Sequence, residues 1–157
     1  MTAQTRIRTN PLSLPDFNVS GDLPVGIHNA SLAEMTTRFA NDSTRRKMLV
    51  LRLQRIYRIA VQTGCLARFV VFGSFVTSKP EPNDVDVYLI MDDNFDVGQM
   101  RGEPALLFDH STAQTHFGCS VFWVRRMAAL GGELASIADW QIKRDGTRRG
   151  IVQITGE

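Results

Sequence analysis

Two aspartates separated by one residue, Asp84 and Asp86, form the part of the chain best suited to chemistry. They open a short apolar run, Val87–Met91, whose β-branched and aromatic residues favour a strand. In a strand, side chains two residues apart point to the same face, so the two carboxylates are expected to lie close together. Like charges at that separation repel unless a proton or a cation lies between them. Because Mg²⁺ usually takes one or two carboxylates plus water and phosphate oxygens, the spacing indicates a magnesium site.

A Gly-Ser pair, Gly73 and Ser74, ends an earlier apolar run that predicts a strand over Ala67–Phe72. A glycine here lets backbone amides approach a phosphate that a larger side chain would hold away, and the serine adds a hydroxyl donor. Lys79, in the proline-containing loop that follows, could neutralise phosphate charge. We therefore predict nucleotide binding at Gly73, Ser74 and Lys79. An ordinary tight turn and a solvated loop lysine are the alternatives.

A strand ending in Gly-Ser, a spacer, and then Asp-apolar-Asp opening the next strand resembles the DNA-polymerase-β-like nucleotidyltransferase superfamily. The resemblance implies that Gly73 and Ser74 contact a nucleoside triphosphate and that Asp84 and Asp86 hold one or two Mg²⁺ ions. It also implies transfer of a nucleoside monophosphate to a hydroxyl group of a protein, an RNA or a small molecule. Through its Leu23–His28 segment the chain further looks similar to small stand-alone bacterial nucleotidyltransferase-like proteins.

The superfamily usually carries a third carboxylate on the next strand, here predicted over Gly118–Val124, but Ser120 occupies the matching position. A serine hydroxyl is a poor magnesium ligand and a poor base at neutral pH. Three interpretations remain: another acid such as Asp109 or Asp139 completes the site, the enzyme works weakly with two carboxylates, or catalysis has been lost. The last would make the chain a nucleotide- or partner-binding module, for example in a toxin–antitoxin or phage-defence pair.

Histidines and arginines offer further candidates. His110 and His116 precede the third strand in a predicted loop, with a spacing that does not match a zinc site. His116 is a candidate general base, because an imidazole pKa lies near neutrality. Arg52, Arg55 and Arg58 share one side of a predicted helix and could follow a nucleic-acid backbone. A solvated helix surface is the alternative for the arginines.

Two helices are predicted before the Gly-Ser strand. Ser31 and Glu34 have capping-box spacing, which predicts a helix to about Ala40. Ser43 is the next cap, and apolar residues recur at helical spacing over Thr44–Thr63.

Shorter elements are predicted in the second half of the chain. Short helices are expected at Pro104–Phe108 and Gly131–Ile137. Asp139–Lys143 and Gly150–Thr155, on either side of an Asp-Gly turn, predict a β-hairpin.

Composition indicates one domain. The chain has 157 residues, of which 43% are hydrophobic and 22% charged, and its net charge of +2 is too small to argue nucleic-acid binding by itself. Residues 1–30, broken by proline and glycine, predict an arm that is either extended and lying on the domain or partly disordered. Residues 31–157 predict a single small α/β (α+β) nucleotidyltransferase-like domain, with a mixed sheet of four or five strands flanked by helices.

Cysteine usage and hydropathy point to a cytoplasmic protein without a membrane partner. Cys65 and Cys119 are expected to be buried free thiols. No stretch approaches the ~20 apolar residues that a membrane span needs, and the N-terminus has no signal-peptide core.

Overall fold

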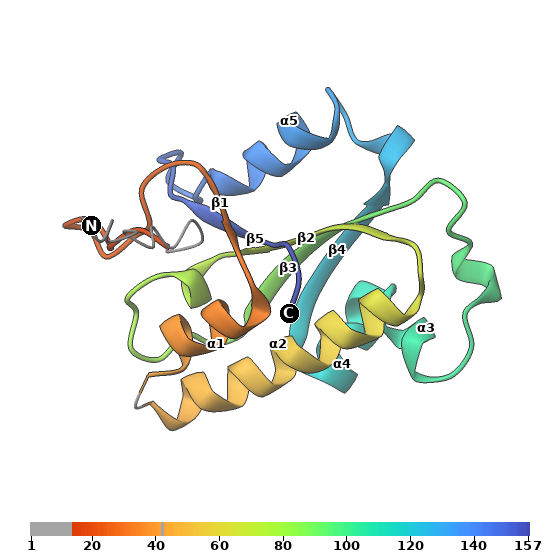
Figure 1. The fold of residues 1–157 in the computed structure, drawn as a ribbon, viewed down its shortest axis with the longest axis horizontal. Coiled ribbons are helices and arrows are strands. Elements are labelled where there is room, and N and C mark those ends of the chain that lie inside the picture. The colour runs from red at the N-terminus through yellow and green to blue at the C-terminus, as the bar shows by residue number, and fades with distance from the viewer. Residues whose placement is uncertain (1–13, 42) are drawn as a thin grey trace, which may run out of the picture.

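One mixed sheet organises the computed structural model, which describes residues 14–41 and 43–157 (Figure 1). Its strands are β1 (Ile27–Ala30), β2 (Leu66–Phe72), β3 (Val85–Met91), β4 (Cys119–Arg125) and β5 (Ile151–Ile154). They are arranged in the order β1-β5-β2-β3-β4. β2 runs antiparallel to β5 and β3, whereas β1 is parallel to β5 and β4 is parallel to β3. The predicted mixed α/β fold with four or five strands is confirmed.

Helices cover both faces of this sheet (Figure 1). On one face lie α1 (Leu32–Ala40), α2 (Thr44–Gln62), α3 (Glu103–Leu107) and α4 (His110–Phe117), and on the other lies α5 (Glu133–Ala138). Alternating strand residues pack on the two layers: Phe69 and Val71 join the larger apolar cluster, and Val70 and Tyr88 join the cluster on the α5 side. α3 and α5 lie where short helices were predicted. Within the described residues, no helix has the length and apolar content to cross a membrane.

Serine caps set the starts of the first two helices, as predicted. Ser31 Oγ accepts the N–H of Glu34 at 3.0 Å, and Ser43 Oγ accepts the N–H of Arg46 at 3.3 Å. The Glu34 carboxylate does not complete a capping box, because it accepts the backbone N–H of Leu14 at 3.0 Å instead. It therefore ties the N-terminal segment to α1.

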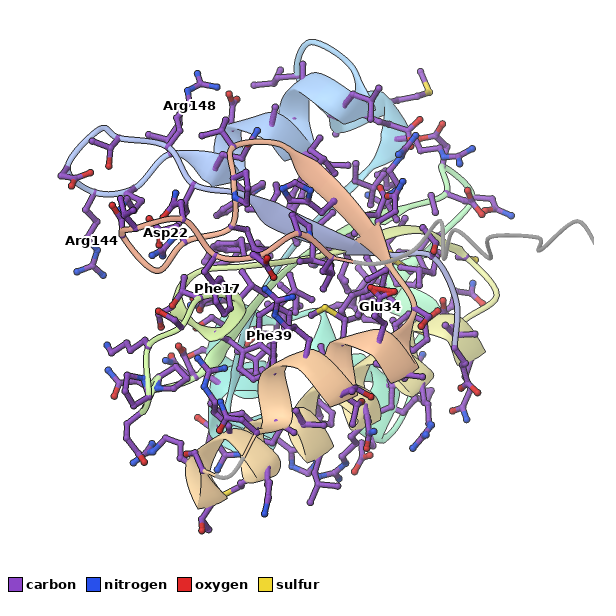
Figure 2. All side chains as sticks on the ribbon, turned by 60° about the vertical axis from the view of Figure 1, so that its left-hand side comes forward. Phe17, Asp22, Glu34, Phe39, Arg144 and Arg148 are labelled. Atoms are coloured by element: carbon purple, nitrogen blue, oxygen red, sulfur yellow. The ribbon has the colours of Figure 1, made fainter. Side chains whose placement is uncertain are left out.

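The sheet extends into the N-terminal segment, which we expected to form an arm (residues 1–30) outside a domain of residues 31–157. β1 lies in that segment and pairs in parallel with β5. Phe17 packs on Phe39 with ring centroids 6.2 Å apart, so the chain before β1 lies on the domain (Figure 2). A strand of four residues is too short to show a periodic pattern, and its partner is remote in sequence. Residues 1–13 lie outside the described part of the chain.

The predicted C-terminal hairpin is wrong. Asp139–Gln141 forms a 3-10 turn, and an isolated bridge joins Ile142 to Arg148. The second predicted strand is present as β5, but it pairs with β1 and β2 inside the sheet. The Asp-Gly turn itself is confirmed, because the N–H of Gly146 donates to the carbonyl of Lys143 at 2.9 Å. A local turn signal does not determine the strand with which its flanking residues pair.

A buried guanidinium, that of Arg46, fixes the loop between β2 and β3. The residue is 1% exposed and donates hydrogen bonds of 2.5–3.1 Å to four backbone carbonyls. Three of them belong to that loop, at Phe75, Thr77 and Lys79, and the fourth is the carbonyl of Phe39 in α1. Burial lowers the pKa of Arg46. The cost of burying this guanidinium is offset because each of its N–H groups donates to a backbone carbonyl. One side chain of α2 therefore ties the backbone of the loop to α1 and α2.

Replacing this guanidinium should release the loop. We expect Arg46→Ala to lower the free energy of unfolding by about 3–5 kcal/mol, because four carbonyls lose their donor in a buried place. The control is Arg45→Ala, which removes an exposed ion pair with Glu81 and should cost less than about 1 kcal/mol. Urea denaturation measures both changes. Equal losses in the two variants would contradict this role of Arg46.

Candidate functional site

The register of the central strands brings two carboxylates and a hydroxyl together. Asp86 on β3 is aligned with Ser120 on β4, and Asp84 directly precedes β3. The Ser120 hydroxyl donates to Asp84 Oδ2 at 2.9 Å. On the other side of Asp86 lies Phe72, the last residue of β2. The two aspartates therefore lie between the end of β2 and the start of β4.

A cavity of about 720 Å³ opens over these carboxylates. The residues predicted to bind phosphate, Gly73, Ser74 and Lys79, line it together with Asp84 and Asp86. All five site residues predicted from the sequence thus share one cavity. The side chain of Lys79 is exposed, and Arg46 holds the backbone of this residue through its carbonyl.

Gly73 has a backbone conformation and a surrounding space that suit glycine alone. Its φ is +80°, and a Cβ built there would lie 2.2 Å from Asp86 Oδ2. The chain therefore passes the carboxylate at a distance that any side chain would prevent. Ser74 follows at the start of a 3-10 turn, Ser74–Val76, and its carbonyl accepts the hydroxyl of Thr77 at 2.6 Å.

Without a bound cation, the carboxylates of Asp84 and Asp86 repel each other. Burial, and then the charge of Asp84, raise the pKa of Asp86 from 3.8 to about 6. The charge of Arg149 acts in the opposite direction without cancelling the rise in this pKa. A bound cation would relieve the repulsion that remains when both groups are ionised.

The donor set at the carboxylates fits magnesium. Asp84 and Asp86 are half-buried beside an open cavity, so water and phosphate oxygens could complete an oxygen shell around Mg²⁺. In the described part of the chain, no group of three or more His, Cys, Asp or Glu side chains comes together as a fuller metal site. Two carboxylates suffice for Mg²⁺ only with ligands from substrate and solvent.

Ser120 occupies the place where the resemblance implies a third carboxylate, and neither alternative acid replaces it. Asp109 caps α4, where it accepts the N–H of Thr112 at 2.8 Å. Asp139 is an exposed residue of the turn after α5. The side chains that line the cavity include neither of them. The interpretation in which another acid completes the site is therefore not supported.

The two histidines lie on α4 rather than in the predicted loop. Asp109 caps this helix and Gly118, at φ +67°, ends it, but its mixed side chains show no clear apolar stripe in the sequence. His116 Nε2 lies 3.0 Å from Glu103 Oε2, outside the cavity, so it is not placed to act as the base. His110 lines the cavity instead.

A cationic wall, formed by Lys143, Arg144 and Arg149, was missed as part of the site. Buried Asp22 positions two of its members: Asp22 Oδ2 lies 3.1 Å from Lys143 Nζ, and Oδ1 lies 3.9 Å from Arg149 Nη1. Figure 2 shows Asp22 beside the loop that carries Arg144 and Arg148. The basic residues are visible in the sequence, but their proximity to the aspartates arises only from long-range packing.

Aromatic rings form another wall of the cavity. Trp140 packs on Phe72 and Phe122 with ring centroids 4.4 and 5.0 Å apart, and on Tyr88 at 5.1 Å. Phe72, Phe122 and Trp140 line the cavity, and Phe122 remains 36% exposed. The cavity thus offers a flat apolar surface beside its charged groups.

The arginine side of α2 is engaged within the chain. Arg52 donates to the Gly118 carbonyl at 3.4 Å, Arg55 pairs with Glu103, and Arg58 lies 3.8 Å from Glu157. These contacts favour the solvated helix surface over a continuous track for a nucleic-acid backbone.

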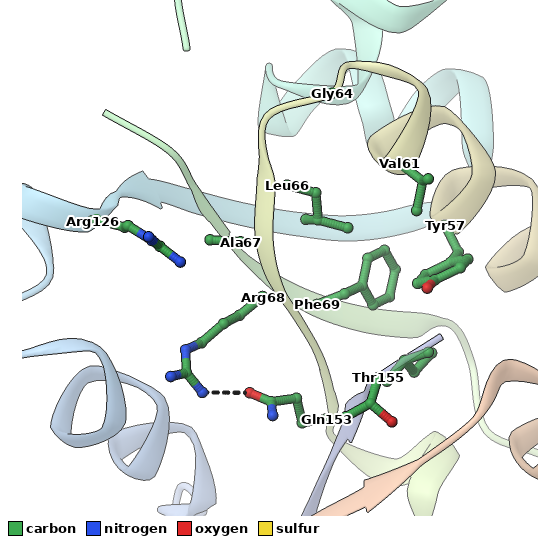
Figure 3. A pocket seen from close by; sticks show the side chains of 11 residues that line it. Tyr57, Val61, Gly64, Leu66, Ala67, Arg68, Phe69, Arg126, Gln153 and Thr155 are labelled. Atoms are coloured by element: carbon green, nitrogen blue, oxygen red, sulfur yellow. Dashed lines mark hydrogen bonds between the residues drawn. The ribbon is translucent and has the colours of Figure 1, made fainter. Parts of the chain in front are cut away.

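A second cavity, of about 500 Å³, lies at the opposite end of β2 (Figure 3). Its cations are already paired with acids: Arg68 lies 3.0 Å from Glu133, and Arg126 lies 3.5 Å from both Glu133 and Asp92. It contains none of the predicted site residues. We therefore place the candidate site in the cavity over the aspartates.

Comparison with known proteins gave one kind of match. A family model described as "Family of unknown function (DUF6932)" matches residues 15–155, a span that contains every candidate site residue. The searches of curated proteins and of solved structures gave no match.

A methyl group at Gly73 should disturb the carboxylates. We expect Gly73→Ala to lower the free energy of unfolding by roughly 2–4 kcal/mol, because a strained φ is combined with a clash against Asp86. The control is Gly64→Ala, which has a similar φ of +70° but no atom within 4 Å of the new methyl, and should cost about 1 kcal/mol. Thermal denaturation of both variants gives the comparison. Equal costs would mean that Asp86 moves aside freely.

The raised pKa of Asp86 should appear in the pH dependence of stability. The folded state holds this proton more tightly than the unfolded state, so the contribution of Asp86 to stability is lost as the pH rises from about 4 to about 6. Relative to Asp86→Asn, the wild type should lose about 2–3 kcal/mol of unfolding free energy across this range. Urea denaturation at a series of pH values, with exposed Asp16→Asn as the control, measures the difference. A constant difference between wild type and Asp86→Asn would contradict it.

Proposed function

The chain belongs to the DUF6932 family of unknown function, and we propose from its site that it transfers a nucleoside monophosphate from a nucleoside triphosphate to a hydroxyl acceptor, with Mg²⁺. The observation that carries the proposal is the pair of half-buried carboxylates, Asp84 and Asp86, beneath a cavity that also holds the Gly73–Ser74 turn. The cavity combines a place for a divalent cation with a place for phosphates. The acceptor is a protein, an RNA or a small molecule, and the expected setting is the cytoplasm.

In this proposal, different residues of the cavity bind the phosphates and the cation. Gly73 lets phosphate oxygens approach the backbone, and the Ser74 hydroxyl donates to them. Lys79 and the cationic wall (Lys143, Arg144, Arg149) offset the remaining phosphate charge. Asp84 and Asp86 would hold Mg²⁺. When bound, the ion would polarise the phosphoryl group and neutralise charge that develops on it.

The reaction is an in-line displacement at the α-phosphorus. The acceptor oxygen forms a bond to this phosphorus, the bond to the oxygen of the β-phosphate breaks, and pyrophosphate leaves. The acceptor's proton passes to a base. Positioning and charge neutralisation, which the cavity residues supply, account for most of the catalysis in such transfers.

A second candidate is a nucleotide- or partner-binding module without chemistry. Ser120 favours it, because its hydroxyl donates to Asp84 where a third carboxylate would otherwise add charge and basicity. Such a module would retain Mg²⁺-dependent nucleotide binding. A role in a toxin–antitoxin or phage-defence pair is one form that this candidate could take.

Both candidates can be tested with α-labelled nucleoside triphosphates and Mg²⁺. The wild type should transfer label to itself, to added RNA or to glycerol. Asp84→Asn and Asp86→Asn should each reduce transfer on the order of 10²–10³-fold, because the cation and the developing charge lose their ligands. Asp93→Asn, at the far end of β3, is the matched control and should leave transfer unchanged.

Calorimetry with ATP separates the outcomes. Binding that requires Mg²⁺, without transfer to any acceptor, would favour the binding module. Transfer that persists in the Asp84→Asn, Asp86→Asn double variant would refute the catalytic proposal. Absence of ATP binding to the wild type, with and without Mg²⁺, would refute both transfer from ATP and the nucleotide-binding form of the module.

A further inference from the structure

The proposed reaction needs a group that takes the acceptor's proton, and the third position of the site does not supply it. The hydrogen of the Ser120 hydroxyl is already donated to Asp84, and a neutral hydroxyl is a weak base. Asp84 and Asp86 are assigned to the cation. The inference below rests on the proposed function and concerns this missing base.

The order of elements across the sheet gives the cavity two sides. Gly73 follows β2, the aspartates lie on β3, and Ser120 lies on β4, with α4 packed beside it. His110 and Gln114, both on α4, line the cavity beyond Ser120. The phosphate-binding turn and the α4 residues therefore lie on opposite sides of the carboxylates.

The cationic wall lies on the phosphate side. Asp22, which contacts Lys143 and Arg149, forms a bridge with Thr77 in the loop that follows Gly73. The α4 side is lined instead by the Gln114 amide, the His110 imidazole and the exposed ring of Phe122. An uncharged compound with an apolar part suits that surface better than a polyanion does.

The ring of His110 is oriented by two contacts. Its Nδ1 lies 3.3 Å from the carbonyl oxygen of Val121, and its ring lies on Phe122 with centroids 4.7 Å apart. A carbonyl oxygen accepts hydrogen bonds only, so Nδ1 must carry the hydrogen. In the neutral imidazole, Nε2 then has a free lone pair and is able to accept a proton.

We propose that His110, Gln114 and Phe122 form the acceptor subsite for an uncharged hydroxyl compound, and that His110 is the general base. The acceptor hydroxyl gives its proton to His110 Nε2 while its oxygen bonds to the α-phosphorus. The electron pair of the broken bond leaves with pyrophosphate. The imidazolium then returns the proton to solvent. The imidazole of His110 thus acts as the general base in place of a third carboxylate.

The other two histidines of the chain are occupied elsewhere. His28 Nε2 contacts the Pro24 carbonyl at 2.6 Å, and His116 contacts Glu103. Neither of them lines the cavity. His116 is a matched control for His110, because both lie on α4 and both are exposed.

The tautomer provides a test that needs no turnover. In long-range ¹H–¹⁵N spectra of histidine-labelled protein at about pH 8, above the ordinary imidazole pKa, His110 should be protonated on Nδ1. Comparison with His110→Ala assigns its signals among those of the three histidines. An Nε2–H tautomer would overturn the proposal, because that nitrogen could not then accept a proton.

Kinetics test the role directly, with ATP as donor and glycerol or N-acetyltyrosinamide as acceptor. His110→Ala should slow pyrophosphate release on the order of 10²–10³-fold. It should keep the Kd for ATP with Mg²⁺ within about twofold, because the histidine lies on the other side of the carboxylates. Added imidazole should restore part of the rate, and His116→Ala should match the wild type.

The outcomes separate this inference from the proposed function. His110→Ala acting at the wild-type rate, or losing ATP binding, would overturn the role of His110 while nucleotidyl transfer stands. Transfer to an RNA oligonucleotide but to neither glycerol nor N-acetyltyrosinamide would overturn the acceptor class. A wild type that binds ATP but transfers to no acceptor would refute the transferase function, and the base assignment with it.

Discussion

The buried guanidinium of Arg46 is the interaction on which the rest of the site depends. Its hydrogen bonds to the carbonyls of Phe75, Thr77 and Lys79 secure the loop that leaves Gly73. Without such donors, these carbonyls would lack partners in a water-poor region, and only the packing of apolar side chains such as Phe75 on Phe39 would hold the loop against α1. A buried charge thus determines where the Gly73–Ser74 turn lies relative to the carboxylates. Its effect on function is indirect, through the position of the backbone.

The carboxylate pair shows how a binding site can act against stability. Asp86 lies beside Asp84 in a half-buried place, and its raised pKa expresses the cost of ionising it there. In a purely structural protein, an asparagine would be the more stable choice at this position. Retention of two acids makes sense if a cation binds, because the ion turns the repulsion into a favourable interaction. The same reasoning explains the cations of the wall, which line the same cavity as the aspartates.

Local sequence signals predicted the residues that share the candidate site, and part of the fold. The spacing of Asp84 and Asp86 and the glycine at position 73 are short-range features, and the structure brings them to one cavity. The serine caps of α1 and α2 are local as well. In contrast, β1, the cationic wall and His110 depend on contacts between segments remote in sequence, and no periodic pattern reports such contacts. The resemblance located Ser120 correctly beside the aspartates, but a single sequence does not reveal which residue could replace the absent acid.

The position of β5 has a consequence for the order in which the molecule is completed during synthesis. This strand is near the end of the matched region, yet it lies between β1 and β2. Until the ribosome releases it, β1 has no strand partner and β2 presents an open edge, which invites pairing with other chains. The cationic wall directly precedes β5, so the cavity gains the positive charges of this wall in the same late step. A nascent chain therefore completes the cavity over its aspartates only as its sheet closes.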